Sequence, residues 1–275
     1  MDKINVSALS VAFQTSSGEY LEAIDKVFFA IKPGETFALL GESGCGKSMT
    51  ASAILQLMPS NAYCHQQSRV QFEDVELLSL SESEMQLFRG KRIGMIFQEP
   101  MTSLNPVLTI GQQLVEVIRK HSSTTENNWQ YATQLLEQVE LPDPQRQLQA
   151  YPHQLSGGQK QRVMIAMALA LEPDIIIADE PTTALDVTIQ AKILELLGEL
   201  RDERNMGLIL ITHDLAIAAE ISDKVIVLNE GKIVEKGITN DVFINPNHAY
   251  TRKLMDSIPG KLIKRKKKIS KKFSD

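Results

Sequence analysis

The sequence predicts an α/β fold built on a mainly parallel sheet with helices on both faces. Two observations favour it. Strands and helices alternate in the C-terminal part of the chain, and near the N-terminus a glycine-rich loop joins a short apolar strand to a helix. Such alternation is typical of parallel sheets, because the connection between parallel strands is usually a helix. The alternating segments are expected as strands at 175–178, 208–212 and 224–228, and as helices at 187–203 and 215–221.

The preceding part of the chain is expected to begin with β structure and then to become largely helical between residues 98 and 170. Residues 4–9 and 26–31 have the mixed apolar pattern of short strands, with a polar turn at 14–19 between them. The elements expected after the breaker pair Pro33-Gly34 are strands at 36–40 and 92–97 and helices at 47–58, 83–90, 109–120, 129–139 and 157–171.

Length and composition are those of an ordinary globular chain. The 275 residues suffice for one large domain, or for one domain with an inserted subdomain. Hydrophobic residues make up 43% and charged residues 23%, so disorder of the whole chain is excluded. The two cysteines, Cys45 and Cys64, cannot make a disulfide framework, which favours a reducing cytosol. Cys45 is expected to serve packing rather than redox chemistry.

No segment has the length of a membrane span. The longest uninterrupted apolar run covers nine residues, 163–171, whereas a spanning helix needs about 20. The first 15 residues lack the apolar core of a signal peptide. If the protein serves a membrane, we expect it to dock there through a partner.

Charge is unevenly distributed along the chain. The net charge of −5 divides into +7 for residues 261–275 and −12 for the rest. An acidic body argues against a nucleic-acid-binding surface, which would be basic. The basic tail 261–275 is expected to be solvated and disordered, and contact with anionic lipid or RNA remains an alternative for it.

The glycine-rich loop fits G-x-x-x-x-G-K-[ST], the pattern of a Walker A phosphate loop. Its glycines let the backbone wrap closely so that N–H groups point at phosphates, and the following helix aims its positive end at the same place. Lys47 is expected to reach the β- and γ-phosphates of ATP, and the Ser48 hydroxyl to bind Mg²⁺. The residues expected to bind ATP here are Gly41, Glu42, Ser43, Gly44, Cys45, Gly46, Lys47, Ser48 and Met49.

Two acids follow the apolar strand at 175–178, in the arrangement of a Walker B motif. Asp179 and Glu180 end this strand at the edge of the sheet where the phosphate loop is expected. Asp179 is expected to hold Mg²⁺, directly or through water. Glu180 is expected to polarise the attacking water as the general base. An Asp-Glu pair alone is usually a solvated surface feature, but here Ile-Ile-Ile precedes it and Pro181 follows it.

A third motif resembles the signature of the ABC (ATP-binding cassette) ATPase family. It consists of Leu155, Ser156, Gly157, Gly158 and Gln159. A hydroxyl and glycine N–H groups at a helix N-terminus form an anion site, although a plain glycine helix cap would look similar. The resemblance implies that this loop binds the γ-phosphate of the ATP held by an opposite subunit. It also implies a P-loop NTPase (RecA-like) core with an antiparallel β subdomain and an inserted α-helical signature subdomain.

The remaining motifs of the family occur in the same order and extend the resemblance over about residues 3–259. Gln98 resembles the Q-loop glutamine, which senses Mg²⁺ and water and couples the site to the membrane partner. Asp186, in Ala-Leu-Asp, resembles the D-loop aspartate at the dimer interface. His213 resembles the switch histidine that contacts the γ-phosphate, and Phe13 the aromatic that stacks on adenine. In isolation His213 would be an ordinary surface histidine, and Phe13 an ordinary core residue.

Two segments resemble the oligopeptide, dipeptide and nickel importer branch of the family. They are Phe-Gln-Glu-Pro-Met-Thr-Ser-Leu-Asn-Pro at 97–106 and Asn-Pro-Asn-His-Ala-Tyr-Thr at 245–251, in which Ala249 replaces the usual proline. The stretch around the signature looks closest to the peptide and microcin C type ATPases. The cysteine cluster that some relatives carry after this segment is lacking, so no iron–sulfur cluster is expected. The expected domains are a cassette at 1–244 with a helical insertion at about 98–170, a C-terminal segment at 245–260 and the tail.

The resemblance implies an ATP-binding and ATP-hydrolysing subunit of an ABC transporter that imports peptides or related small solutes. Its expected cofactors are ATP and Mg²⁺. Its expected partners are a second cassette, supplied by another chain as a homo- or heterodimer, two transmembrane permeases and, indirectly, a solute-binding protein. Its expected place is the cytoplasmic face of the cell membrane, as a peripheral protein. The rival interpretation is a soluble ABC ATPase acting on ribosomes or DNA, which would usually carry two cassettes or a long coiled coil.

Overall fold

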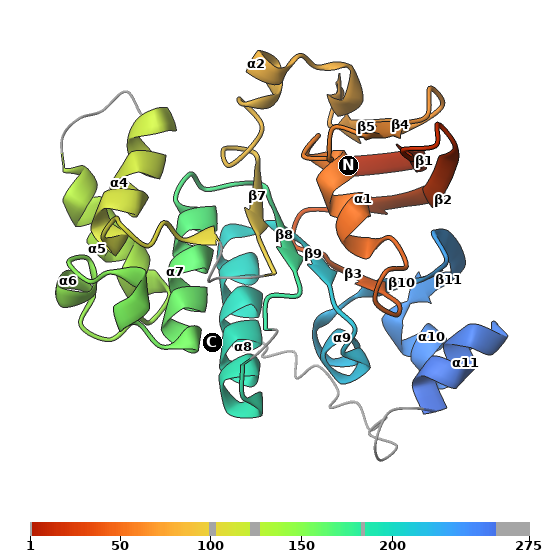
Figure 1. Ribbon diagram of the computed structural model, residues 1–275. Coiled ribbons are helices and arrows are strands. Elements are labelled where there is room, and N and C mark those ends of the chain that lie inside the picture. The colour runs from red at the N-terminus through yellow and green to blue at the C-terminus, as the bar shows by residue number, and fades with distance from the viewer. Residues whose placement is uncertain (1, 99–102, 122–126, 183–184, 257–275) are drawn as a thin grey trace.

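The structure is a computed structural model that describes residues 2–98, 103–121, 127–182 and 185–256 (Figure 1). Its described strands form two sheets. A six-stranded sheet has the order β11-β10-β3-β9-β8-β7, and a second sheet has the order β2-β1-β5-β6, with β4 also paired to β1. All pairs of the second sheet are antiparallel, whereas in the first only β11 runs antiparallel to its neighbour. The predicted α/β fold class is confirmed.

The elements follow one another closely along the chain. The strands are β1 (Ile4–Gln14), β2 (Tyr20–Ile31), β3 (Thr36–Leu40), β4 (Ala62–Cys64), β5 (Arg69–Phe72), β6 (Val75–Glu76), β7 (Ile93–Ile96), β8 (Ile175–Asp179), β9 (Gly207–Ile211), β10 (Lys224–Asn229) and β11 (Lys232–Ile238). The helices are α1 (Lys47–Ile54), α2 (Glu82–Met85), α4 (Ile110–His121), α5 (Asn128–Gln138), α6 (Pro144–Gln147), α7 (Gly157–Leu169), α8 (Val187–Arg204), α9 (Leu215–Ile221), α10 (Thr239–Ile244) and α11 (Ala249–Asp256).

The central strands β3, β9 and β8 of the six-stranded sheet are buried on both faces, and the side chains of β8 alternate between two cores. In β8, Ile175 and Ile177 belong to the core shared with the antiparallel sheet and α1. Ile176 and Ala178 belong to the core under helices α4, α5, α7 and α8. A strand covered on both sides reads as a continuous apolar run, which is why residues 175–178 contain no polar side chain. The sheet therefore joins the antiparallel and helical parts of the molecule (Figure 1).

Four adjacent strands of this sheet, β3, β9, β8 and β7, run parallel and end at the same edge. In open α/β sheets, ligands bind beyond the carboxyl ends of the strands. The phosphate loop, His213, Glu180 and Gln98 follow these four strands, and Asp179 is the last residue of β8. The strand order alone therefore places the sequence-predicted motifs next to one another.

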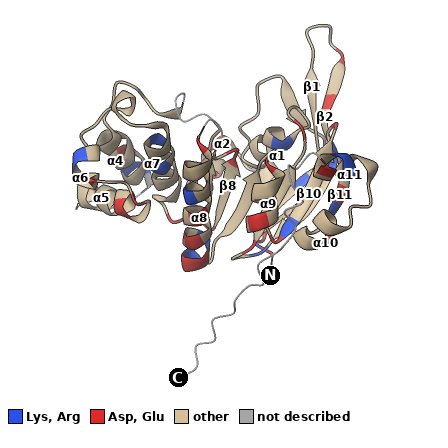
Figure 2. Ribbon diagram, turned by 90° about the horizontal axis from the view of Figure 1, so that it is seen from below, with Lys and Arg blue, Asp and Glu red and all other residues tan. Residues whose placement is uncertain are grey.

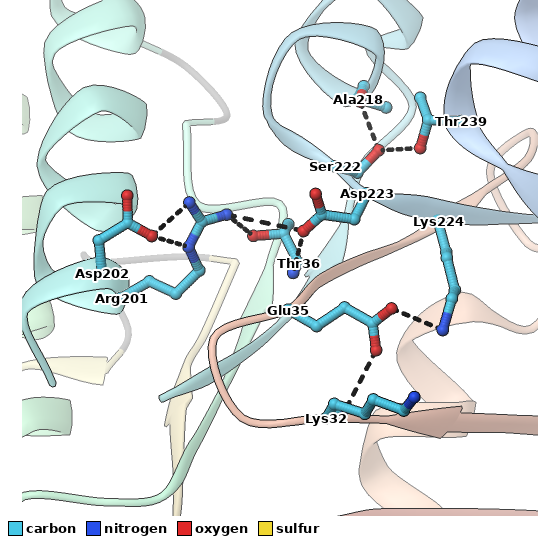
Figure 3. Close-up of polar contacts among 10 residues, drawn as sticks. All are labelled: Lys32, Glu35, Thr36, Arg201, Asp202, Ala218, Ser222, Asp223, Lys224 and Thr239. Atoms are coloured by element: carbon cyan, nitrogen blue, oxygen red, sulfur yellow. Dashed lines mark hydrogen bonds and ion pairs between the residues drawn. The ribbon is translucent and has the colours of Figure 1, made fainter. Parts of the chain in front are cut away.

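A polar network fixes the opposite, amino end of β3 (Figure 3). The Thr36 N–H donates to the Asp223 carboxylate at 2.9 Å, and Arg201 of α8 donates to the Thr36 hydroxyl. One residue earlier, Glu35 pairs with Lys224 at 2.6 Å. These contacts tie β3 to β10 and α8, so they hold in place the strand from which the phosphate loop emerges.

Several elements differ in length from the sequence expectation. Helix α1 ends at Ile54 rather than at residue 58, because Gln56 adopts a left-handed conformation with φ of 51°. The Leu57 N–H then donates back to the Ser52 carbonyl at 2.8 Å, which closes the helix end. The expected strand 26–31 is the second half of β2, whose first half pairs with the end of β1. The short strands β4, β5 and β6 were not predicted.

Two sequence expectations concern membrane spans and the basic tail. None of the helices in the described part of the chain combines the length and the apolar character needed to cross a bilayer. The basic tail 261–275 and the last four residues of the segment 245–260 lie outside the described residues.

Candidate active site

The phosphate loop connects β3 to α1, and its backbone lies unusually close to its neighbours. Gly41 has a φ of 150°, and a Cβ placed there would lie 2.4 Å from the Leu228 carbonyl oxygen. Gly46 precedes α1 with a φ of 103°, and a Cβ there would lie 2.8 Å from the Ala23 carbonyl oxygen. Only glycine fits at these two positions. The loop is therefore held tightly against β2 and β10.

Lys47 lies inside this loop, with 5% of its surface exposed. Its Nζ donates to the carbonyl oxygens of Gly41 and Glu42, each at 2.9 Å. An ammonium group has three donors, and the third faces the Cys45 Sγ at 3.9 Å, a weak acceptor. The loop therefore positions the ammonium while leaving one donor available to a stronger acceptor such as a phosphate oxygen.

Ser48 and Asp179 come together although 131 residues separate them. The Ser48 hydroxyl donates to the Asp179 carboxylate at 3.0 Å. Burial raises the pKa of the Asp179 carboxyl, and the charge of Glu180 adds to this, whereas the Ser48 hydrogen bond and the Lys47 ammonium lower it. A hydroxyl and a buried carboxylate are the hard oxygen donors that Mg²⁺ prefers.

Glu180 is the centre of a second group of side chains. Its carboxylate accepts a hydrogen bond from Gln98 Nε2 at 3.0 Å and pairs with His213 Nδ1 at 3.1 Å. These three residues follow the adjacent strands β8, β7 and β9. Glu180 has a φ of 46°, rare for a residue other than glycine, and its N–H donates to the Ile211 carbonyl at 2.9 Å. Such backbone strain at the end of a buried strand is a known feature of functional sites.

The predicted Mg²⁺ ligands are only partly brought together. Gln98 donates to Glu180, and its hydrogen bonds within the described residues reach neither Ser48 nor Asp179. The described residues also contain no cluster of three or more His, Cys, Asp or Glu side chains arranged to hold a metal ion. The direct protein ligands that the geometry offers are therefore the Ser48 hydroxyl and the Asp179 carboxylate.

The signature residues form the N-terminus of α7. The Ser156 hydroxyl accepts a hydrogen bond from the Gln159 N–H, and the Gln159 side chain accepts one from the Ser156 N–H, which makes a capping box. Gly158 packs against Ile189 of α8 so closely that a Cβ would lie 2.8 Å from its Cγ2. Asp186 caps α8 by accepting the Ile189 N–H at 3.0 Å. The signature and the D-loop aspartate therefore form one packed unit.

This unit does not meet the phosphate loop of its own chain. Among the described residues, the hydrogen bonds of 155–159 lie within α7 and its preceding turn, Leu155 packs in the core under the helices, and the two glycines face Leu185 and Ile189. Figure 1 shows α7 and α1 on either side of β8. The sequence-predicted site therefore falls into two separate parts. Residue 184 of the D-loop and residues 99–102 after Gln98 lie outside the described residues.

The remaining predicted ATP contacts lie in different environments. Phe13 is half-buried on β1, opposite Leu21 of β2 and Ala62 of β4, and it is not among the residues of the described core clusters. Leu21 is 63% exposed, so this pair offers an accessible apolar surface. Met49 packs its side chain against the core and offers its first-turn N–H. Burial raises the pKa of the Cys45 thiol, in line with a packing role.

Two residues that contact the phosphate loop were missed by motif reasoning. The Gly231 N–H, in the turn between β10 and β11, donates to the Cys45 carbonyl at 3.2 Å. The Tyr250 hydroxyl, on α11, accepts the Glu42 N–H at 3.3 Å. Neither belongs to a nucleotide motif. The sole sequence signal for Tyr250 was its place in the branch-like segment 245–260.

Comparison with known proteins gives consistent matches. The family model described as ABC transporter matches residues 24–183. The peptidoglycan transport ATP-binding protein YejF of Agrobacterium fabrum is 51% identical over 257 residues, which are 93% of this chain and 47% of that protein. The oligopeptide transport ATP-binding protein OppD of Bacillus subtilis is 48% identical over 257 residues, 93% of this chain and 72% of that protein.

Solved structures agree. The ATP-binding cassette MJ0796, solved as a dimer in a post-hydrolysis state with ADP and Pi, matches with a TM-score of 0.76 and 30% identity over 86% of this chain and 98% of that chain. This chain spans about half the length of the peptidoglycan relative and nearly three quarters of the oligopeptide relative. The motifs, the fold and these matches together show that the chain belongs to the ABC transporter family, among its ATP-binding subunits, which are ATPases.

Proposed function

We propose that residues 41–48 bind the phosphates of ATP, that Glu180 is the general base for its hydrolysis, and that hydrolysis drives the import of peptides or related small solutes. The observation that carries this proposal is the contact between Glu180, Gln98 and His213, beside the Ser48–Asp179 pair. These groups come from the ends of adjacent parallel strands, where an α/β sheet binds its ligand.

Phosphate binding follows from the loop and α1. The N–H groups of the loop and the first turn of α1 favour an anion, and Lys47 adds a held positive charge. The Ser48 hydroxyl and the Asp179 carboxylate fit Mg²⁺, which would neutralise charge on the β- and γ-phosphates when bound. Phe13 on β1 would stack on adenine.

Glu180 is placed to act on water beyond the γ-phosphate. Its two oxygens are held by Gln98 and His213, so the carboxylate has a fixed orientation. His213 is 62% exposed and can turn toward a phosphate. Gln98 follows β7, where the chain enters the helical region. A change at the site would therefore pass through the Gln98 amide to residues 98–170.

A complete site requires two chains. The signature residues 155–159 do not reach the phosphate loop of their own chain, and we propose that they bind the γ-phosphate held by a second cassette. The dimeric, ADP-bound structure of a relative supports this. Residues 1–244 would form the cassette with its helical insertion, and the segment from 245 would be an addition to it.

The remaining partners are proposed from the relatives. Two of them are a peptidoglycan and an oligopeptide transport ATP-binding protein, which supports two permeases, a solute-binding protein and a peripheral place on the cytoplasmic face of the membrane. Figure 2 shows Lys and Arg interspersed with Asp and Glu along α8 and over the elements in view. Mixed charges support a protein partner rather than nucleic acid.

The first test is Glu180→Gln. This variant keeps the side-chain shape but loses the base, so ATP should bind as in the wild type and turn over at least about 100-fold more slowly. Single-turnover hydrolysis and equilibrium nucleotide binding measure the two quantities. Wild-type turnover in Glu180→Gln would contradict the role given to this carboxylate.

The second test uses the same variant to recover partners from membranes with ATP and Mg²⁺, with identification by mass spectrometry. We expect two permeases, with or without a different cassette protein, which also decides between a homodimer and a heterodimer. Recovery of ribosomal or DNA-repair proteins without any membrane protein would overturn the transport proposal and leave the ATPase assignment intact.

A further inference from the structure

The C-terminal helix α11 folds back onto the nucleotide-binding part of the molecule. Tyr250, Leu254 and Met255 pack against the core formed by β3, β10, α9 and α10. Figure 1 shows α10 and α11 together beside β10 and β11. The helix is therefore anchored to the same strands that flank the phosphate loop.

A buried carboxylate fixes the start of this helix. Glu235 of β11 accepts the N–H groups of Asn247 at 2.7 Å and His248 at 3.1 Å, one on each carboxylate oxygen. The Tyr250 N–H donates to His248 Nδ1 at 3.2 Å. These hydrogen bonds set the direction in which Tyr250 leaves the backbone, because its residue lies in the first turn of the helix.

The Tyr250 hydroxyl contacts one particular peptide unit of the phosphate loop. The Gly41 carbonyl and the Glu42 N–H belong to the same planar peptide group, and in a trans peptide they point in opposite directions. The carbonyl accepts from Lys47 Nζ at 2.9 Å, and the N–H donates to the Tyr250 hydroxyl at 3.3 Å. This peptide unit is thus held from both sides, by Lys47 within the loop and by Tyr250 outside it.

We propose that Tyr250 is a positioning residue for ATP binding: its hydroxyl fixes the Gly41–Glu42 peptide plane and thereby the direction of the Lys47 ammonium. The inference rests on the proposed phosphate-binding role of residues 41–48. Rotation of this peptide plane would remove the Gly41 carbonyl from Lys47, so the ammonium would lose one of the two carbonyl oxygens that aim its third donor.

The size of the effect follows from the exposure of the contact. The Glu42 N–H lies at the surface, so water can replace the Tyr250 hydroxyl without leaving a buried group unpaired. A net hydrogen-bond contribution of this kind corresponds to about a two- to tenfold change in an equilibrium constant. Burial raises the pKa of the Tyr250 hydroxyl, which keeps it neutral over the physiological range.

The test compares Tyr250→Phe with Met255→Ala in the full chain. Tyr250→Phe keeps the ring that packs against the core and removes only the hydroxyl, whereas Met255→Ala reduces the packing of the same helix and leaves the hydroxyl. We expect Tyr250→Phe to raise the Kd for Mg·ATP about two- to tenfold without changing Tm. Met255→Ala is expected to lower Tm and to leave this Kd within about twofold. The opposite pattern would overturn the inference.

A second comparison, in a Lys47→Ala background, tests whether Tyr250 acts through Lys47. If Tyr250 acts through Lys47, Tyr250→Phe should have little further effect on the Kd in a Lys47→Ala background, and an equal effect in both backgrounds would contradict this. Lys47→Ala also separates the two proposals. Wild-type ATP binding in Lys47→Ala would overturn the phosphate-binding role of the loop, whereas defective Lys47→Ala with unaffected Tyr250→Phe would overturn only the role of Tyr250.

Discussion

At the scale of single residues, the buried charge of Asp179 lowers the stability of the fold around it. Asp179 is 5% exposed, and burial raises the pKa of its carboxyl above the ordinary value. A carboxyl whose pKa is higher in the folded than in the unfolded state costs stability once both states are ionised. The charge is therefore present for ligand binding rather than for folding.

We expect Asp179→Asn to be more stable than the wild type at pH 7.5 without nucleotide, and to be inactive in ATP hydrolysis. Asparagine can still accept the Ser48 hydrogen bond but carries no buried charge. The stability gain should shrink as the pH falls through the raised pKa and vanish where aspartate is protonated in both states. Thermal unfolding at several pH values measures this, with the exposed Asp74→Asn as the control. A lower Tm for Asp179→Asn than for the wild type at pH 7.5 would contradict a destabilising charge at Asp179.

At the scale of elements, the contact between α7 and α8 leaves no space at Gly158. A methyl group there would lie 2.8 Å from the Ile189 Cγ2, which is attached to the rigid Cβ. The helices would have to separate, and the signature loop at the start of α7 would move with them. This close approach explains the glycine without reference to phosphate binding.

Gly158→Ala should accordingly destabilise the protein by about 1–3 kcal/mol, the usual cost of overpacking. Ile189→Ala removes the clashing atom, so the double variant should lose less stability than the sum of the two single variants. Urea unfolding of the wild type, the two single variants and the double variant gives the coupling free energy between the two substitutions. Additive losses would show that the methyl group introduced by Gly158→Ala does not clash with Ile189.

The attachment of α11 gives a pH-dependent prediction. Burial opposes the charge of Glu235, yet its hydrogen bonds outweigh burial and hold the pKa of this carboxyl below its usual value. The ionised Glu235 carboxyl therefore stabilises the fold above about pH 4.5, the ordinary pKa of glutamate. This stabilisation is lost as the pH falls through the lower pKa of the folded state. Glu235→Gln should cost about 1–3 kcal/mol at pH 7, because one N–H loses its acceptor. The cost should disappear under acid, whereas exposed Glu230→Gln should be neutral throughout.

The elements also show which parts of the structure the sequence could predict. Residues 36–40 and the helix 215–221 were predicted with their observed bounds, because apolar runs and flanking breakers are local signals. The end of α1 was wrong by four residues, because the left-handed turn at Gln56 is stabilised by contacts of its side chain with the Leu77 carbonyl. Likewise the contact between Glu42 and Tyr250 joins residues 208 apart, and no local pattern reports it.

At the scale of the whole molecule, an ion-pair network joins the antiparallel sheet to the six-stranded one. Lys3 and Glu73, at the antiparallel sheet, pair with each other at 2.7 Å. Arg92 and Asp174 precede β7 and β8 and pair with each other. Lys3 contacts Asp174 at 2.8 Å and Arg92 contacts Glu73 at 3.0 Å, so each residue has two partners. Networks of this kind contribute more than isolated surface pairs.

Asp174→Asn should therefore lower Tm by a few degrees, corresponding to about 1 kcal/mol in a chain of this size. The loss should be larger at low ionic strength, because salt screens partly exposed charges. Asp202→Asn is the control, since its carboxylate is 69% exposed and its ion pair within the described residues is with Arg201 alone. Equal changes in Tm for the two variants would indicate that the four-residue network stabilises the protein no more than a single surface ion pair does.

The strand order also determines how a movement at the phosphate loop can reach the helical region. Neighbouring strands in a sheet lie about 4.8 Å apart, so the three steps from β3 to β7 cover roughly 14 Å. A displacement that begins at Ser48 can pass sideways, through Asp179 and the adjacent Glu180 to Gln98. β7 is the last strand at this end of the described sheet and pairs there with β8. The chain therefore leaves the sheet for the helical region at the margin of the sheet, while the helices also pack on the face of β8 through Ile176 and Ala178.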